Sequence, residues 1–328
     1  MLSRIAESLY WMARNLERAD GTARILDINL IHMLEADEGT SEEGQWRPLL
    51  DIVDAQDAYL DRHPDGLVGV QRVIQFLAQD KANPSSLYNC VRLARENARI
   101  VRDRISNEMW EAINQLWLAL ERDLRGPLQP WRAPDLFARI HREVALVQGT
   151  AQRTMMRGEA HAFTVLGHLQ ERADMTARIL DVRYHLLLPD PSLVGSPLDY
   201  YQWAALLKCL SAFEAYRRHY QGGIRPLDVV ALTILDPDFP RSLVYCVDGL
   251  ERALARTGQV PDGTAGDRLE ALRTHLGDVR PQDIFEQGLH EYLEGFLADL
   301  AELTEALHAD YFDTSPTASS EAVTIGAD

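Results

Sequence analysis

The feature that most constrains this chain is a run of eleven residues that occurs twice with a single difference. Residues 17–27 read ERADGTARILD, and residues 171–181 read ERADMTARILD. A match of this length is not credible by chance, so it predicts an internally duplicated unit. Many of the repeated residues are charged, which helix packing alone does not require. The repeat is therefore also the main indication of where function lies.

Two further segments extend the repeat in the same order. Residues 45–50 match residues 202–207, and residues 80–91 match residues 236–247, at offsets close to that of the first pair. Strand signals are almost absent. We therefore predict an all-α, internally duplicated, pseudo-symmetric helical bundle. Residues 1–158 form the first repeat and residues 159–313 the second, together in one compact domain, and residues 314–328 form a disordered tail.

Apolar residues near the start of the chain recur every three or four positions from Ile5 to Leu30, which predicts one long helix. A second long helix is expected from Pro84 towards Leu120, because Asn83 and Pro84 form a helix-start signal. Further helices are expected over residues 135–156 and from Pro281 to Phe312. At ordinary helix lengths the chain would hold about ten to twelve helices.

Composition excludes several classes of protein. The net charge of −17 argues against a broad surface for nucleic acid or anionic membrane. No apolar run is long enough for a membrane-spanning helix, and charged residues interrupt the first twenty positions, unlike a signal peptide. Three cysteines without CxxC spacing predict neither a disulfide framework nor a zinc site. We expect a cytoplasmic protein that contacts neither nucleic acid nor membrane.

The repeated motif places a charged stripe beside the apolar face of its helix. In the first repeat the stripe comprises Arg14, Glu17, Asp20, Arg24 and Asp27. In the second repeat it comprises His168, Glu171, Asp174, Arg178 and Asp181. Arg18 and Arg172 are expected to point to a different side of their helices.

Three interpretations of this stripe remain open. It can be a solvated face with pairs such as Asp20–Arg24, each worth about 0.2–0.5 kcal/mol. It can be a structural network, in which the two motif helices face each other and Glu17 and Glu171 form buried, crossed ion pairs with arginines. It can also be a ligand site, where carboxylates and guanidinium groups hold a polar substrate.

A second charged run lies on the predicted Pro84 helix and includes Arg95, Glu96 and Arg99. The matching part of the second repeat, residues 248–255, lacks this polar pattern, so the first repeat is the better candidate for a site. No phosphate-binding loop or nucleophile motif is present, and only one Glu-x-x-His spacing occurs, from Glu305 to His308. We therefore expect no metal and no cofactor.

The assembled residues resemble the bacterial alpha-E family over nearly the whole chain. The resemblance is carried by the following motifs: Ser3-Arg4 with Glu7, Leu9-Tyr10-Trp11, Arg14, Glu17-Arg18-Ala19, Asn83-Pro84-Ser85-Ser86, Ala94-Arg95-Glu96-Asn97-Ala98-Arg99, Glu171-Arg172-Ala173-Asp174 and Phe239-Pro240-Arg241-Ser242. One departure is Leu166-Gly167-His168, where the family usually has Leu-Gly-Arg.

The resemblance implies a helical protein encoded beside circularly permuted ATP-grasp ligases and transglutaminase-like proteases, with a role in forming, modifying or trimming peptide-type amide bonds. Two hypotheses follow. In the first, the chain is a partner of an ATP-grasp ligase system that binds the ligase or its peptide-like substrate, with a transglutaminase-like protease as a second candidate partner. In the second, it is an enzyme of peptide or amide chemistry, with Glu as general base and Arg stabilising charge.

The resemblance supplies no established catalytic residue, so the residues of the matching motifs are site candidates only. The candidate catalytic residues are Glu17 and Glu171. The candidate substrate-binding residues are Arg14, Arg18, Asp20, Arg24, Arg95, Glu96, Arg99, Arg172, Asp174 and Arg178.

Overall fold

One long helix at the start of the chain has its apolar face buried along most of its length. In the computed structural model, which describes residues 1–35, 41–187, 197–258, 263–277 and 279–313, helix α1 spans Ser3–Glu35. The residues spaced by three and four positions, from Leu9 through Leu16 to Leu30, are buried. The helix predicted from this spacing is thus confirmed, and its apolar stripe faces the core.

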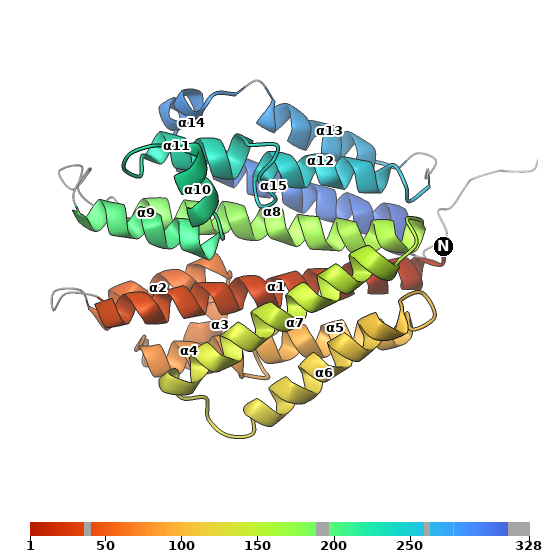
Figure 1. Ribbon diagram of the computed structural model, residues 1–328, viewed down its shortest axis with the longest axis horizontal. Helices are drawn as coiled ribbons and strands as arrows, with labels where there is room; N and C mark the ends of the chain where they lie inside the picture. The colour runs from red at the N-terminus through yellow and green to blue at the C-terminus, as the bar shows by residue number, and fades with distance from the viewer. Residues whose placement is uncertain (36–40, 188–196, 259–262, 278, 314–328) are drawn as a thin grey trace, which may run out of the picture.

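A second long helix, α8 (Glu159–Leu187), packs against α1 through the middle of the molecule. Figure 1 shows this pair at the centre, with the other helices of the first half on one side and those of the second half on the other. The first half continues with α2 (Glu42–Ile52), α3 (Gln56–Arg62), α4 (Val70–Ala78), α5 (Leu87–Ile100), α6 (Asn107–Asp123) and α7 (Ala133–Thr154). The second half continues with α9 (Pro197–Cys209), α10 (Phe213–His219), α11 (Pro226–Val230), α12 (Leu243–Leu254), α13 (Ala265–Leu276), α14 (Pro281–Gln287) and α15 (Leu289–Leu307).

The all-α class is confirmed, because the described residues form helices and their connections and no strand. Helix α8 begins at Glu159, where the second repeat is predicted to begin. The internal duplication and the two repeat boundaries stay predictions. The predicted tail, residues 314–328, lies outside the described residues. Among the described helices, none is long and apolar enough to cross a bilayer.

The prediction of a single helix from Pro84 towards Leu120 was wrong. The chain forms α5 and α6 instead, and each begins after a serine that caps it. Ser86 Oγ accepts a hydrogen bond from the Asn89 amide at 3.2 Å, and Ser106 Oγ accepts one from the Met109 amide at 3.1 Å. Ser106 therefore starts a new helix within the predicted one, because its side chain satisfies an amide that lacks an intrahelical partner.

The last predicted helix, Pro281 to Phe312, is likewise divided. Gly288 has a φ of 106°, a conformation that residues with a side chain rarely adopt, and it separates α14 from α15. A short π-helical segment, His308–Phe312, follows α15. These two divisions, together with several short helices, bring the described chain to fifteen α-helices, more than the ten to twelve expected.

Candidate functional site

The Glu-Arg pairs of the repeated motif are exchanged between α1 and α8. Glu171 on α8 is bound by two arginines of α1. Arg14 Nε donates to Glu171 Oε2 at 2.8 Å, and Arg18 donates to both carboxylate oxygens, with Nη2 3.0 Å from Oε2. Behind them, Arg14 Nη1 donates to the Tyr10 hydroxyl at 3.0 Å, and that hydroxyl donates to Gln170 Oε1 at 2.7 Å. The Glu171 side chain is only 1% exposed, so this is a buried ion pair.

The Glu17 carboxylate has a matching set of partners, three from the second half and one, Gln148, from α7 of the first. Arg172 Nε donates to Oε1 at 2.9 Å, and Arg241 Nη1 donates to the same oxygen at 3.2 Å. Gln148 Nε2 donates to Oε2 at 2.9 Å, and His168 Nδ1 lies 3.0 Å from that oxygen. The Glu17 side chain is also 1% exposed. The crossed ion pairs that the sequence left as one of three alternatives are therefore present.

The prediction that Arg18 and Arg172 point away from the stripe was wrong. Each reaches the glutamate of the opposite helix. Arg18 and Arg172, which directly follow the two glutamates, also lie on the face along which α1 and α8 pack. Their long side chains extend from one helix to the glutamate of the other. The two Glu-Arg dipeptides thus act between helices rather than within them.

Both glutamates are held in the ionised form despite their burial. Burial alone would raise the pKa of Glu17, but Arg172, His168 and Arg241 outweigh it and hold the pKa well below 4.5. Burial likewise opposes ionisation of Glu171, and the guanidinium groups of α1 bring its pKa below the usual value. Carboxylates stabilised in this way are weak bases.

These lowered pKa values predict a loss of stability in acid. A group whose pKa is lower in the folded than in the unfolded state stabilises the fold above its unfolded pKa, here about 4.5, and this contribution is lost as pH falls through the folded value. The free energy of unfolding, measured with urea from pH 7 to pH 3, should fall below about pH 4.5. In the double variant Glu17→Gln/Glu171→Gln this fall should be shallower. If the free energy of unfolding falls equally steeply with pH in parent and variant, Glu17 and Glu171 do not have lowered pKa values in the folded protein.

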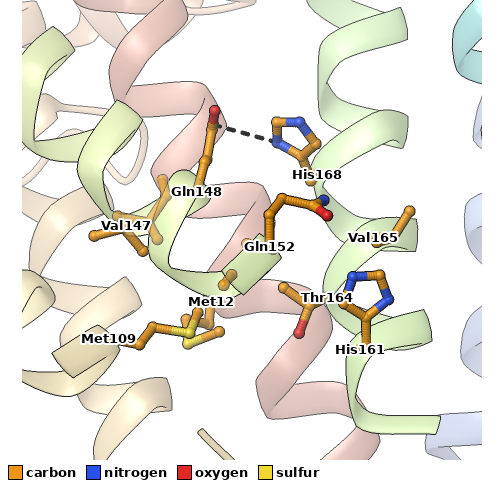
Figure 2. A pocket seen from close by; sticks show the side chains of 12 residues that line it. Met12, Met109, Val147, Gln148, Gln152, His161, Thr164, Val165 and His168 are labelled. Carbon is orange, nitrogen blue, oxygen red and sulfur yellow. Dashed lines mark hydrogen bonds between the residues drawn. The ribbon is translucent and has the colours of Figure 1, made fainter. Parts of the chain in front are cut away.

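A small cavity adjoins the Glu17 end of the network. It has a volume of about 60 Å³ and lies between α1, α6, α7 and α8. Figure 2 shows Gln148 and His168 at one end of it, with Met12, Met109 and Val147 among its apolar lining. Both polar residues also contact Glu17. The cavity is far smaller than ordinary ligand sites of about 300–1,000 Å³, so it cannot hold a peptide-like substrate.

Asp20, three residues beyond Glu17, has partners from three elements. Arg24 Nε donates to Oδ2 at 3.1 Å, the predicted intrahelical pair, and Arg241 Nη2 donates to the same oxygen at 3.0 Å. His141 Nδ1 on α7 lies 2.7 Å from Oδ1. Burial would raise the pKa of Asp20, but these partners lower it. Asp20 therefore belongs to the same ionic network as Glu17.

The matching aspartate of the second half, Asp174, lies in a different environment. Its pair with Arg178 is present, with Nε 2.9 Å from Oδ2. Burial and then the nearby Glu171 charge raise its pKa, the opposite direction from Asp20. The repeat supplies Ser85 at the position of Arg241, so no second arginine reaches Asp174 from that loop. Within the described residues, no group of three or more His, Cys, Asp or Glu side chains is placed to hold a metal ion.

Comparison with known proteins also points to the Glu-Arg pairs. A model of the alpha-E family, described as a predicted alpha-helical domain with a conserved ER motif, matches residues 1–312. The chain belongs to the alpha-E family. Uncharacterized proteins of Mycobacterium tuberculosis and Mycobacterium bovis are each 26% identical to it over 337 residues. The match covers 95% of this chain but only 36% of those relatives. No solved structure matches the chain.

The other charged run of this alpha-E chain lies apart from the Glu-Arg network. On α5, Arg95 Nε donates to Asn114 Oδ1 of α6 at 2.7 Å, and its guanidinium lies over the Trp110 ring. Arg95 and Arg99 both pair with Glu96. Within the described chain, no hydrogen bond or ion pair joins these three candidates to Glu17 or Glu171. Unlike the buried pairs, this run is accessible, and the Arg99 side chain is 67% exposed.

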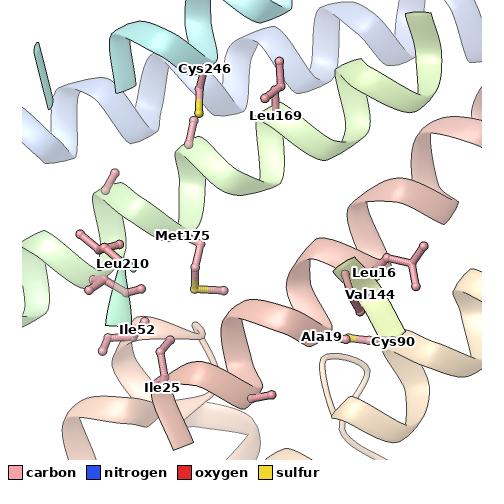
Figure 3. Close-up of a cluster of buried hydrophobic side chains, with 14 of the residues drawn as sticks. Leu16, Ala19, Ile25, Ile52, Cys90, Val144, Leu169, Met175, Leu210 and Cys246 are labelled. Carbon is pink, nitrogen blue, oxygen red and sulfur yellow. The ribbon is translucent and has the colours of Figure 1, made fainter. Parts of the chain in front are cut away.

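The single mismatch in the repeat lies where the two alpha-E motif helices meet. A Cβ atom on Gly21 would lie 3.0 Å from Cγ of Met175, the residue at the matching position. Figure 3 shows the Met175 side chain among apolar residues between the helices. A side chain at position 21 would require Met175 to shift by a few tenths of an ångström, which agrees with a glycine facing the larger methionine.

All three cysteines are free and buried. Cys90 and Cys246 occupy matching positions on α5 and α12, and both are fully buried (Figure 3). Burial raises the pKa of each thiol to about 12. A thiol with so high a pKa is not a nucleophile at neutral pH.

Arg241, Gln148 and His141 are among the members of the network that were not predicted as site residues. Arg241 stands in the motif Phe239-Pro240-Arg241-Ser242, so the family resemblance could have indicated it. Gln148 and His141 lie on α7, in a stretch without a motif or a matching repeat segment. Only the packing of α7 against α1 brings them to Glu17 and Asp20.

Proposed function

We propose that this alpha-E protein is a non-catalytic helical partner of an ATP-grasp ligase that forms peptide or amide bonds. The observation that carries this proposal is the complete engagement of Glu17 and Glu171. Each is 1% exposed, and each is bound by two arginines. The buried Glu-Arg pairs then hold the frame of the protein, and other surfaces contact the partner.

The alternative, an enzyme with Glu17 or Glu171 as general base, has less support. A general base must reach the proton that it removes, and its pKa should lie near the working pH. Both glutamates are covered by protein, and both have lowered pKa values. Glu17 lines neither the cavity of about 60 Å³ beside it nor the larger groove between α7, α8 and α12, although its partners Gln148 and His168 line both. Neither glutamate is therefore placed to act on a substrate.

The curated relatives add support for a partner role. The region that matches this chain makes up 36% of each relative, so the alpha-E domain occurs there joined to other sequence. This arrangement favours a domain that works together with other domains over one that acts alone.

The accessible charged run on α5 suggests where the ligase binds. Arg95, Glu96 and Arg99 are the candidate residues on α5, and Trp110 lies beneath two guanidinium groups, those of Arg95 and Arg102. Aromatic and arginine side chains are enriched at the centres of protein interfaces. We therefore place the contact with the ligase on the α5–α6 face.

The proposal is tested with the purified chain and the ATP-grasp ligase of the same genome. Binding is measured by calorimetry, and ATP hydrolysis by the ligase is followed with and without the chain. We expect a complex and a change in the hydrolysis rate. Arg99→Glu should weaken binding at least tenfold, because it reverses an exposed charge at the proposed contact.

Arg268→Glu is the matched control. Arg268 lies on α13 in the second half, away from the α5–α6 face, has a side chain 50% exposed, and is paired with Glu302, as Arg99 is paired with Glu96. Binding that falls equally in both variants would move the contact away from Arg99. The absence of both a complex and any effect on hydrolysis would contradict the partner role.

A further inference from the structure

A cationic groove lies between α7 of the first half and α8 and α12 of the second. Its volume is about 620 Å³, and its charged lining consists of Arg157, Arg172, Arg252 and Arg256, with His161 and His168. No aspartate or glutamate is among the residues that line it. This composition is unusual in a chain with a net charge of −17.

Three of these guanidinium groups have no carboxylate partner among the described residues. Arg157 Nη2 donates to the backbone oxygen of Gln152 at 2.6 Å, and Arg256 Nη1 donates to the Arg157 backbone oxygen at 3.4 Å. Arg252 makes no ion pair within the described chain, and all three residues are exposed. Arg172, at the inner end, is the exception, because Glu17 holds it. The groove therefore presents uncompensated positive charge in a planar, multidentate form that suits oxyanions.

The positive charge of the groove follows the repeat only in part. At the offset of the first repeated segment, Arg172 and His168 correspond to Arg18 and Arg14. At the offset of the third, Arg252 corresponds to Glu96. At that position the second half carries a guanidinium where the first half carries a carboxylate.

The groove also shifts the titration of a histidine within it. Burial, followed by the charges of Arg157 and Arg256, lowers the pKa of His161. A neighbouring anion would offset those two charges. His161 can therefore report on what occupies the groove.

We infer that this groove binds a small ligand that carries at least two phosphate or carboxylate groups. Its volume, about 620 Å³, falls in the range of about 300–1,000 Å³ that is usual for sites of small molecules and cofactors. The exposed guanidinium groups of Arg157, Arg252 and Arg256 hold the anionic groups, and Tyr245 contributes an aromatic surface to the lining. This inference does not depend on a ligase partner.

Calorimetry with two probes at fixed ionic strength tests the inference. Pyrophosphate represents phosphate ligands, and the dipeptide Glu-Glu represents carboxylate ligands. We expect the parent chain to bind one probe at least tenfold more tightly than the other, which names the class of ligand. Arg252→Ala/Arg256→Ala should weaken that binding at least tenfold, because charge-assisted hydrogen bonds are the strong ones.

The matched control is Arg217→Ala/Arg218→Ala, which removes two exposed arginines from α10 and changes the net charge equally. It should bind as the parent does. In addition, the pKa of His161, followed by NMR, should rise when the preferred probe is bound. The inference is overturned if neither probe binds at millimolar concentration, if both double variants lose binding equally, or if the His161 pKa does not move.

Discussion

Replacement of Glu17 by glutamine is expected to destabilise the folded protein by about 3–5 kcal/mol, the usual cost of removing one partner from a buried ion pair. Glutamine keeps the shape of the side chain and one acceptor oxygen but removes the charge. Arg172, with a side chain 12% exposed, would then lose its counter-ion, and Arg241, 14% exposed, would keep only Asp20. Glu171→Gln should cost a similar amount, because it leaves Arg14 and Arg18 without theirs.

Urea unfolding at pH 7 measures both losses, and Glu43→Gln is the control. Glu43 pairs with Arg47 on the surface of α2, with side chains 55% and 35% exposed. Removal of that charge should cost less than about 1 kcal/mol, because exposed pairs contribute little. If Glu17→Gln and Glu171→Gln are as mild as Glu43→Gln, the pairs are not structural, and the motif would have to be reconsidered as a binding site.

The exchange of ion pairs between α1 and α8 could be foreseen only as one alternative. The spacing of Arg14, Glu17 and Asp20 defines a face of one helix, but it does not say which helix packs against that face. The repeat raised the possibility that the two copies meet. The choice required tertiary structure, since a solvated stripe and a buried stripe share the same sequence pattern.

The asymmetry between the two ends of the network also depends on tertiary structure. In the sequence, His168 at the position of Arg14 looks like the loss of a cation. The structure shows that Arg241 supplies a second guanidinium to Glu17, so each glutamate still has two arginines. No spacing rule links residues 17 and 241, which lie far apart in the chain and meet only when α8 and α12 pack together.

The helix boundaries were predicted well where the signal was local and strong. The buried stripe of α1 and the helix expected over residues 135–156, which forms as α7 (Ala133–Thr154), are examples. The interruptions at Ser106 and Gly288 were not predicted, because a serine or a glycine within a helical pattern is often tolerated. At these two sites a side-chain cap and a positive φ end the helix.

Replacement of Gly167 by alanine is expected to be at least as damaging as the loss of a buried glutamate charge. A Cβ atom at this position on α8 would lie 2.1 Å from the backbone oxygen of Tyr10 on α1. Ala13, which the repeat aligns with Gly167, is also small and buried. Small residues at these positions let the two helices approach closely enough for their arginines to reach the opposite glutamates.

The expected loss is about 3 kcal/mol or more, the upper end for overpacking, because the clash is with backbone that cannot change rotamer. Gly149→Ala is the control, since that glycine lies inside α7 with no atom within 4 Å of an added Cβ. It should stabilise the protein by about 0.5–1 kcal/mol, the helix preference of alanine over glycine. Urea unfolding compares the two variants. If Gly167→Ala is as harmless as Gly149→Ala, α1 and α8 must lie further apart at Tyr10, and the Arg14–Glu171 contact beside it could not have the geometry described.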